Sequence, residues 1–329
     1  MTDLMRAIIY RGPENLNVEN VDLPKISDDE ILVKVKAAGV CGTDIRIYHG
    51  SFRVPLKPGR IIGHEFAGEI VKVGGKIKDL QEASRVTVRP IIHCGKCIYC
   101  MQGRTNICLS RPTLGYEYDG GFAEYIKIPA QAIQIGNVFE VPSSLSYEEA
   151  AITEPLAASI NGIERSNIRA DDTVLIIGAG PLGLMQLQLA KLSGAKVIIS
   201  DFIEERLKLA KNLGADVAIN PKHEDLLALV KEFTGYGADV TIVAVGSPTA
   251  IEQAVKTLRK GGTLNLFGGC SLGSTVTFDP NIIHYGELTV TGSSGFRPIH
   301  HWKALKLAGT GQIKLKPLIT HTLPLERAE

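Results

Sequence analysis

The stretch that decides the fold is Val174-Leu-Ile-Ile-Gly-Ala-Gly-Pro-Leu-Gly183. It begins with four apolar residues, as a buried strand does, and continues into the spacing G-x-G-x-x-G. A helical pattern follows over residues 182–192, and a second apolar run over residues 196–200 ends at Asp201. Asp201 lies 201 − 178 = 23 residues after the first glycine of the pattern. Strand, tight turn, helix and strand in this order predict one βαβ unit of a parallel sheet.

The glycine-rich turn predicts a dinucleotide site. Gly178, Gly180 and Gly183 let the backbone approach a pyrophosphate. The helix that begins at Pro181 and Leu182 directs its N-terminus toward that negative charge. A turn of the same shape that binds nothing is the alternative interpretation.

Asp201 predicts which dinucleotide is bound. Its carboxylate would accept hydrogen bonds from the adenosine ribose hydroxyls and would repel the 2′-phosphate that distinguishes NADP from NAD. We therefore expect NAD as the cofactor. Arg206, about one helical turn further along, is a cation that a 2′-phosphate would meet if Asp201 were neutralised.

The alternation of strands and helices continues beyond this unit. Helical patterns over residues 204–213 and 250–258 separate further apolar runs at residues 197–199, 217–219, 240–245 and 263–267. Continuous apolar strands between helices indicate a parallel sheet covered on both faces. The expected fold class is α/β, with a doubly wound Rossmann sheet over residues 151–285. The uncharged run over residues 173–190 contains three glycines and a proline, so we interpret it as part of this sheet and not as a membrane span.

Residues 1–150 have a different, β-rich pattern. Residues 30–36, 69–73 and 85–89 alternate or cluster apolar side chains as strands do. The first long helical signal begins at Tyr147, with Ser146 as its cap and Glu148 and Glu149 in its first turn.

Charge and composition exclude several classes of protein. Lys plus Arg is 36 and Asp plus Glu is 35, so the net charge is +1. This balance argues against a nucleic-acid partner, and no apolar leader typical of export opens the chain. Clustered cysteines without an export signal favour metal chemistry in a reducing compartment, so we expect a cytoplasmic protein with no membrane partner.

The pattern C-x2-C-x2-C-x7-C predicts a structural metal site. Its members are Cys94, Cys97, Cys100 and Cys108. Four thiolates close a tetrahedral zinc site and leave no open position for a substrate. Two disulfides and an iron–sulfur cluster are the alternatives, but the last gap of seven residues, with no proline after the fourth cysteine, disfavours the cluster.

Three dispersed residues form a second candidate metal site. Cys41, His64 and Glu154 offer a thiolate, an imidazole and a carboxylate, which are all good zinc ligands and would leave one position for water or substrate. Asp44 would orient His64 through a hydrogen bond. Taken singly, a buried cysteine and a hydrogen-bonded histidine need no metal.

The combined motifs resemble the zinc-dependent medium-chain dehydrogenase/reductase family over essentially the whole chain. They stand in the family's order, as Cys41-Gly-Thr-Asp, Gly63-His-Glu, the four cysteines, Gly120-Gly-Phe-Ala-Glu-Tyr125, Glu154-Pro-Leu and the glycine-rich turn. The resemblance implies a GroES-like catalytic domain over residues 1–150 and 286–329, with a structural zinc lobe near residues 90–112. It also implies two zinc ions per chain, with Cys41, His64 and Glu154 at the catalytic one and Glu65 as a nearby or alternating ligand.

Details of the motifs predict the substrate class. A glutamate at position 154 and Phe296-Arg297 resemble the sorbitol and polyol branch, in which the arginine lines the substrate pocket; a surface cation is the alternative for Arg297. Arg46 stands where the family carries a histidine that ends the proton relay, and guanidinium is no base near neutral pH. Thr43 can still pass a proton, with His49 or Glu154 as acceptor.

We therefore expect NAD-dependent oxidation of a secondary alcohol, a polyol above all, by a homodimer or homotetramer. The alternatives are an L-threonine 3-dehydrogenase, a dehydrogenase of phosphorylated sugar alcohols, and a non-enzymatic NAD(H)-binding redox sensor on the same scaffold. Residues 323–329 have the pattern of the first turn of a helix. A single turn is not stable by itself, so we expect the natural protein to continue.

Overall fold

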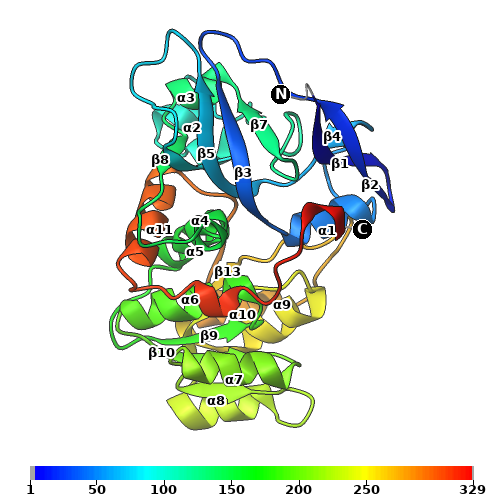
Figure 1. The fold of residues 1–329 in the computed structure, drawn as a ribbon. Coiled ribbons are helices and arrows are strands. Elements are labelled where there is room, and N and C mark those ends of the chain that lie inside the picture. Colours follow the sequence, from blue (N-terminus) through cyan, green and yellow to red (C-terminus); the bar gives the residue numbers. More distant parts are fainter. Residues whose placement is uncertain (1–3, 328–329) are drawn as a thin grey trace. The chain divides into compact units, whose positions relative to one another are not determined.

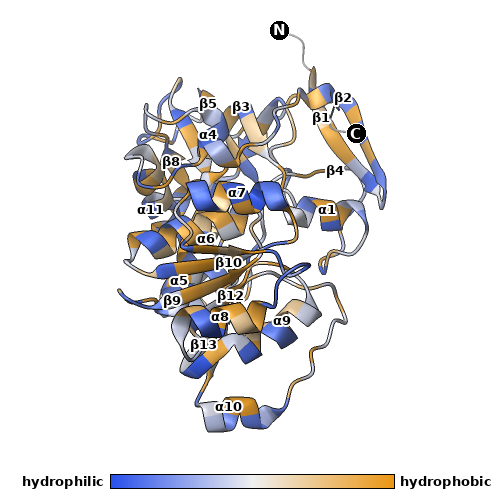
Figure 2. Ribbon diagram, turned by 90° about the horizontal axis from the view of Figure 1, so that it is seen from below, coloured by the Kyte–Doolittle hydropathy of each residue, from blue (hydrophilic) through white to orange (hydrophobic). Residues whose placement is uncertain are grey.

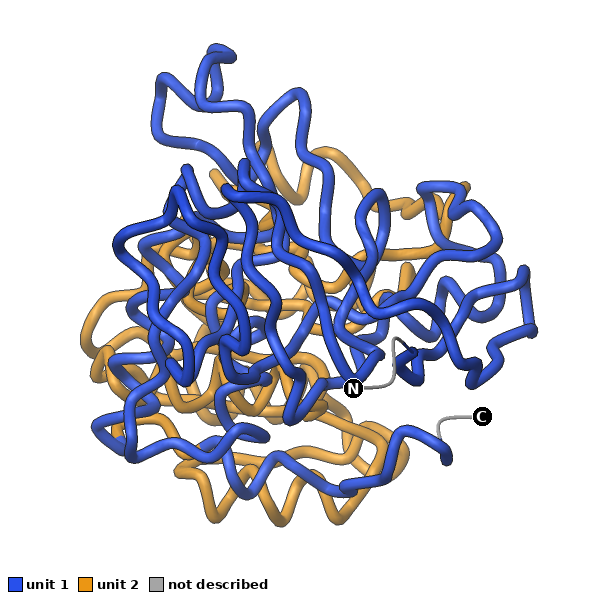
Figure 3. The backbone as a smooth tube through the Cα atoms, turned by 45° about the horizontal axis from the view of Figure 1, so that its top comes forward, with its two compact units in different colours: residues 1–157, 295–311, 315–329 blue, residues 158–294, 312–314 orange. Residues whose placement is uncertain are grey.

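The computed structural model describes residues 4–327. Figure 1 labels the helices and strands in chain order, and Figure 3 colours the two compact units that they form. Unit 1 comprises residues 1–157, 295–311 and 315–329, and unit 2 comprises residues 158–294 and 312–314. No helix among the described residues is long and apolar enough to cross a membrane.

Unit 2 contains the parallel sheet that the sequence predicts. Its strand order is β11-β10-β9-β12-β13-β14, which is the doubly wound order 3-2-1-4-5-6 of dinucleotide-binding domains. The strands are β9 (Thr173–Ile177), β10 (Lys196–Ser200), β11 (Val217–Ile219), β12 (Ala238–Val243), β13 (Leu258–Leu266) and β14 (Thr289–Gly292). The central strands are apolar along their length (Figure 2), because both faces of the sheet are covered.

Helices alternate along the chain with the strands of this sheet. Ser247 and Asp225 cap two of them through hydrogen bonds to backbone N–H groups, as their short polar side chains favour. The helices are α5 (Thr153–Ser166), α6 (Pro181–Leu192), α7 (Glu204–Asn212), α8 (Leu226–Thr234), α9 (Pro248–Ala254), the 3-10 helix η2 (Val255–Thr257) and α10 (Pro280–Gly286). The helix expected over residues 250–258 therefore ends earlier, because η2 leads directly into β13.

Unit 1 is built mainly from two antiparallel sheets. A three-stranded sheet has the order β2-β1-β4, and a five-stranded sheet has the order β7-β3-β5-β6-β8. The strands are β1 (Leu4–Gly12), β2 (Asn15–Asp22), β3 (Ile31–Gly39), β4 (Arg60–Ile61), β5 (Glu65–Val73), β6 (Arg85–Val88), β7 (Tyr125–Ile128) and β8 (Val138–Glu140). These findings confirm the α/β class with a separate β-rich unit.

Short helices connect the strands of unit 1 and carry several of the predicted site residues. They are α1 (Gly42–Tyr48), α2 (Ile98–Met101), η1 (Thr105–Ile107), α3 (Ala130–Gln134), α4 (Tyr147–Ala151), α11 (Pro298–Gly309), η3 (Lys316–Leu318) and η4 (Leu325–Arg327). The capping box of Ser146 and Glu149 begins α4 as predicted. The helical turn expected at residues 323–329 corresponds to η4, and residues 328–329 lie outside the described part of the chain.

Candidate metal and cofactor sites

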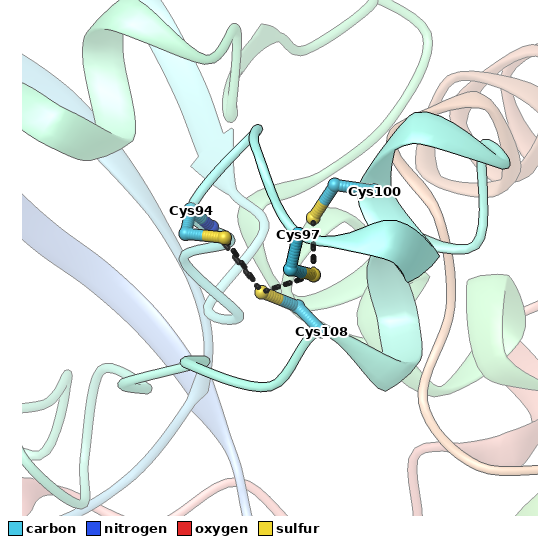
Figure 4. Close-up of side chains that lie close together, drawn as sticks. All are labelled: Cys94, Cys97, Cys100 and Cys108. Atoms are coloured by element: carbon cyan, nitrogen blue, oxygen red, sulfur yellow. Dashed lines mark hydrogen bonds between the residues drawn. The ribbon is translucent and has the colours of Figure 1, made fainter.

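The four cysteines lie around a common centre in a loop of unit 1 (Figure 4). The sulfur–sulfur distances are 3.5 Å for Cys97 to Cys100, 3.7 Å for Cys97 to Cys108 and 3.4 Å for Cys94 to Cys108. A regular tetrahedron with Zn–S bonds of about 2.3 Å has S···S edges of about 3.8 Å. The distances are far above a disulfide bond of about 2.05 Å. The four thiols therefore fit one zinc ion and not two disulfides.

Backbone N–H groups prepare this lobe for anionic sulfur. The N–H groups of Leu109 and Cys100 donate to Cys97 and lower the pKa of its thiol to about 6. Cys100 differs, because burial and hydrogen bonds to Cys108 and Cys97 raise the pKa of its thiol to about 12. These opposite shifts give the thiols of the lobe unequal affinities for protons, and a divalent cation bound at the centre would displace the protons that remain.

A second group of ligand atoms gathers at one end of the five-stranded sheet. Cys41 is the N-cap of α1, and His64 immediately precedes β5, whose first residue is Glu65. One ligand atom from each of these three residues lies within 4.8 Å of the other two. The antiparallel pairing of Gly39 with Glu65 produces this meeting, because it places the end of β3 beside the start of β5.

Glu154 lies in the same electrostatic environment, although it is outside the group of three. Glu65 and Glu154 are only 5% and 9% exposed. Burial, and then repulsion by Glu154, raises the pKa of Glu65 to about 8. Burial raises the pKa of Glu154 to about 7, with His64 and Arg89 opposing the rise and Asp44 adding to it. Two buried carboxyl groups this close are unfavourable as a pair of anions unless a cation lies between them.

Asp44 and Tyr116 hold the imidazole of His64. The Asp44 carboxylate accepts a hydrogen bond from the Cys41 N–H at 2.8 Å and lies 3.5 Å from His64 Nδ1. The Tyr116 hydroxyl lies 3.5 Å from the same nitrogen. Burial lowers the pKa of His64, but Tyr116 and Asp44 outweigh burial and raise it well above its ordinary value. Asp44 thus lies where the sequence analysis expects it, whereas Tyr116 was not anticipated.

The donor set of this cluster fits a catalytic zinc ion. Thiol, imidazole and carboxyl groups are all zinc ligands, and those of Cys41, His64 and Glu65 lie close enough together to share one ion. Gly39 leaves room for the Glu65 carboxyl group, because a Cβ at Gly39 would lie 2.4 Å from Glu65 Oε2. Thr43 lies on α1 beside Asp44, where the sequence analysis expects a proton-passing hydroxyl.

The glycine-rich turn of unit 2 has the geometry of a dinucleotide site. Gly178 has a positive φ of 107°, and a Cβ at Gly183 would lie 1.8 Å from the Gly178 carbonyl oxygen. A Cβ at Gly180, the N-cap of α6, would meet no described atom within 4 Å. Gly178 thus allows the tight turn, Gly183 allows the close contact of helix and strand, and Gly180 allows the approach of a pyrophosphate.

Asp201 lies directly beside this turn. Its carboxylate accepts hydrogen bonds from the N–H groups of Ala179 at 2.7 Å and Ile203 at 3.0 Å. Arg206 Nη1 lies 3.7 Å from the same carboxylate. The Asp201 carboxylate therefore lies at the end of β10, with the exposed Arg206 guanidinium beside it. The helix expected over residues 182–192 begins one residue earlier, because Pro181 takes the first position of α6.

Arg297 is the N-cap of α11 in unit 1. Its guanidinium lies 2.9 Å from His300 Nε2, and its backbone N–H donates to His300 Nδ1 at 3.2 Å. Its role toward substrate remains a prediction.

Arg89 is a second residue that sequence analysis missed. It is fully buried near Glu154, and the only sequence signal is a cation at the end of an apolar strand.

A clustered thiol–imidazole–carboxyl group in one unit and a dinucleotide turn in the other define a zinc-dependent dehydrogenase. Comparison with known proteins agrees. The family described as "Zinc-binding dehydrogenase" matches residues 181–308, and "Alcohol dehydrogenase GroES-like domain" matches residues 27–138. The chain belongs to the zinc-dependent medium-chain dehydrogenase/reductase family.

Curated relatives and solved structures cover nearly the whole chain. L-threonine 3-dehydrogenase of Bacillus licheniformis is 37% identical over 331 residues, which cover 99% of this chain and 94% of the relative. D-arabitol-phosphate dehydrogenase of Enterococcus avium is 34% identical over 332 residues, covering 99% and 92%. A zinc-binding dehydrogenase structure from Sinorhizobium meliloti 1021 with bound NADP has a TM-score of 0.92 at 36% identity, covering 99% and 94%. The short chain alcohol dehydrogenase rspB of E. coli CFT073, complexed with NADH, has a TM-score of 0.89 at 32% identity, covering 98% and 93%.

These comparisons confirm that the chain is an enzyme, an alcohol-type dehydrogenase that uses zinc and a nicotinamide dinucleotide. The relatives are named for threonine and for a polyol phosphate, so they support the reaction more firmly than the sorbitol-type substrate that the motifs predict.

Proposed function

We propose that this chain oxidises the secondary alcohol of a polyol to a ketone, reversibly, with NAD as the hydride acceptor. The observation that carries the proposal is the group of half-buried Cys41 with buried His64 and Glu65, with Glu154 close enough to act on it electrostatically. We assign Cys41, His64 and Glu154 as zinc ligands and Glu65 as a ligand that alternates with Glu154. The four-cysteine lobe would hold the second zinc ion, with a structural role.

The residues of the cluster would have different roles in the reaction. When bound, zinc supplies the Lewis acidity that lowers the pKa of the substrate hydroxyl, and NAD accepts hydride from the substrate carbon. Asp44 and Tyr116 keep His64 in one orientation. Thr43 passes the hydroxyl proton outward, and His49 at the C-terminal end of α1 receives it. The imidazole of His49 is 56% exposed and lies 3.7 Å from Glu14, so it can release a proton to water.

The functional domains and cofactor preference complete the proposal. Residues 1–150 and 286–329 would form the catalytic domain, and residues 151–285 the dinucleotide domain. Asp201 would bind the adenosine ribose and disfavour NADP, while Gly178, Gly180 and Gly183 would accommodate the pyrophosphate. A homodimer or homotetramer is the assembly we expect, and light scattering of the purified protein tests it.

Two alternative substrates have specific support. L-threonine is favoured by the name of the 37% identical relative. A polyol phosphate is favoured by Arg46, which takes the place of the usual relay histidine and carries a charge that phosphate would pair with. The relative named for D-arabitol phosphate points the same way. Arg297, if it turns toward substrate, would serve either a phosphate or a polyol hydroxyl.

A substrate panel tests the proposal. NADH formation is followed at 340 nm with free polyols, their phosphates, L-threonine and simple secondary alcohols, at equal concentration and fixed salt. We expect the highest kcat/KM with a polyol, free or phosphorylated. A clear preference for L-threonine would replace the polyol assignment. If zinc-loaded protein that binds NADH turns over none of these alcohols, the chain is a dinucleotide-binding sensor instead.

A further inference from the structure

Arg89 is a buried cation with no anionic hydrogen-bond partner. It follows β6 and is 0% exposed. Its guanidinium donates to the Phe296 carbonyl from Nε at 3.0 Å and from Nη2 at 2.7 Å, and to the Ile91 carbonyl from Nη1. Asn137 Oδ1 and His93 Nδ1 lie 3.4 Å from Nη1. Within residues 4–327, no carboxylate forms an ion pair with it.

A buried charge without an ion pair is costly unless more distant charges compensate it. Two groups of anions lie close enough to act on Arg89. Burial lowers the pKa of Arg89 to about 9, and electrostatic interaction with Glu154 and with the Cys100 and Cys108 side chains of the lobe opposes that shift. Four thiolates around one Zn2+ carry a net charge of −4 + 2 = −2. The loaded lobe and Glu154 would therefore supply the missing negative charge.

Contacts within unit 1 connect Arg89 to both sites. Toward the lobe, His93 precedes the first cysteine, Cys94. Asn137 Nδ2 donates to the carbonyls of Arg89 at 3.0 Å and Ile91 at 2.9 Å, which fixes the segment that leads into the lobe.

Toward the catalytic cluster, the Phe296 ring lies under the guanidinium at 5.6 Å and meets the His301 ring edge-on at 5.6 Å. His301 Nε2 lies 3.3 Å from the hydroxyl of Thr153, the residue before Glu154. His301 is fully buried, and its ring also stacks on Phe139 at 4.7 Å, so the imidazole has little freedom to move. The guanidinium is thus the one charged group in a continuous series of packed side chains between the two sites.

We propose that Arg89 is a positioning residue that couples the structural zinc lobe to Glu154 of the catalytic cluster. Its forked donors hold the Phe296 carbonyl and the segment before Cys94 in one arrangement, and its charge is shared between the lobe and Glu154. The inference rests on the proposed function only in that Glu154 belongs to the catalytic metal site.

The test measures how fast each zinc ion leaves the full-length, zinc-loaded protein in excess EDTA. Cys97→Ser and Cys41→Ala identify which phase of release belongs to the lobe and which to the catalytic site. We expect Arg89→Met to speed both phases by about tenfold, as loss of a group that orients metal ligands does. Arg85→Met is the matched control, since Arg85 begins the strand β6 that Arg89 follows but contacts Leu145 and the Tyr147 ring. It should leave both phases unchanged.

Arg89→Lys provides a second variant in case the methionine variant does not fold. It keeps the charge and loses the forked donors, so both phases should speed by a smaller factor. Acceleration of only one of the two phases, or of neither, would overturn the coupling. These measurements need no turnover, so they remain decisive even if the proposed reaction fails.

A double-mutant comparison adds a kinetic readout. The fold-losses in kcat/KM for Arg89→Met and Cys97→Ser should combine to less than their product, because both remove the same coupling. Fold-losses that multiply would mean that the two residues act independently and would contradict the proposal.

Discussion

The four-cysteine lobe and the Cys41 cluster are both sulfur-containing candidate metal sites in unit 1, but they are built in opposite ways. The lobe takes all its ligands from residues 94–108, and three of its four cysteines are partly exposed. The Cys41 cluster takes its residues from the start of α1, the start of β5 and α5. His64, Glu65 and Glu154 are buried there.

This difference separates a site that stabilises a fold from a site that does chemistry. A closed set of four thiolates satisfies zinc completely and needs no protection from water. The Cys41 cluster instead concentrates carboxyl groups of raised pKa in a buried place, which costs folding free energy when no metal is bound. Such a cost is typical of catalytic sites, where perturbed pKa values cluster.

The largest expected effect is on turnover. Cys41→Ala should lower kcat/KM by about a thousandfold or more, because it removes about 4 kcal/mol of metal-derived transition-state stabilisation. NADH binding, measured by fluorescence titration, should stay within about twofold of the wild type, since the glycine-rich turn belongs to unit 2. Cys270→Ala, a cysteine outside both sites, should change neither quantity. Loss of NADH binding in folded Cys41→Ala would contradict the assignment of the reaction to the Cys41 cluster and of NADH binding to unit 2.

The next effect concerns the lobe. Cys97→Ser should release one zinc ion per chain and lower the melting temperature by about 5 °C or more, because a structural metal contributes folding free energy. Metal analysis measures the zinc content and differential scanning calorimetry measures the melting temperature, with Cys270→Ser as control. Iron with a visible charge-transfer band in the wild-type protein would contradict zinc in the lobe.

Asp201 belongs to a third site. The glycines of this site lie close together in the sequence, whereas its carboxylate follows the next strand, β10. Like charges a few ångströms apart cost about 1 to 4 kcal/mol near a protein surface, or about one to three decades in affinity. Asp201→Asn keeps the acceptor for the Ala179 N–H and removes the charge, so the NADP/NAD ratio of kcat/KM should rise by at least about tenfold. Asp201→Ser should also weaken NAD, because it shortens the side chain. An unchanged ratio in Asp201→Asn at fixed salt would remove Asp201 from cofactor selection.

The smallest effect is a pH dependence of the metal-free protein. Glu65 has a folded-state pKa of about 8, above its unfolded value, so the folded state binds more protons than the unfolded state between pH 4.5 and 8. Its favourable contribution is fully present below pH 4.5 and is lost as the pH rises through 8. The slope is at most about 1.4 kcal/mol per pH unit.

Urea unfolding of EDTA-treated wild type and Glu65→Gln between pH 5 and 8 measures this contribution. Stability of the wild type should fall relative to the variant as the pH rises. Zinc should reduce the difference, because it binds the ionised carboxyl group. Parallel curves for the two metal-free proteins would show that Glu65 does not hold a proton in the fold.

The sequence determined those features that arise from residues close together in the chain. The spacing of the four cysteines predicted the lobe, because ligands 14 residues apart or less need only a short loop to meet. The glycine-rich turn and its flanking apolar runs predicted β9, α6 and β10, since each glycine meets a local steric demand. The capping box at Ser146 is equally local.

Only the tertiary structure decided which dispersed residues meet. It grouped Glu65 directly with Cys41 and His64, because β3 and β5 pair antiparallel and bring their ends together. Tyr116 and Arg89 escaped the sequence analysis for the same physical reason. Their chemistry depends on which carbonyls, rings and charges surround them after folding. In a one-dimensional pattern, a tyrosine in a loop and an arginine at the end of a strand look like surface residues. The contact of Tyr116 with His64 and the burial of Arg89 follow from long-range packing that no local spacing encodes.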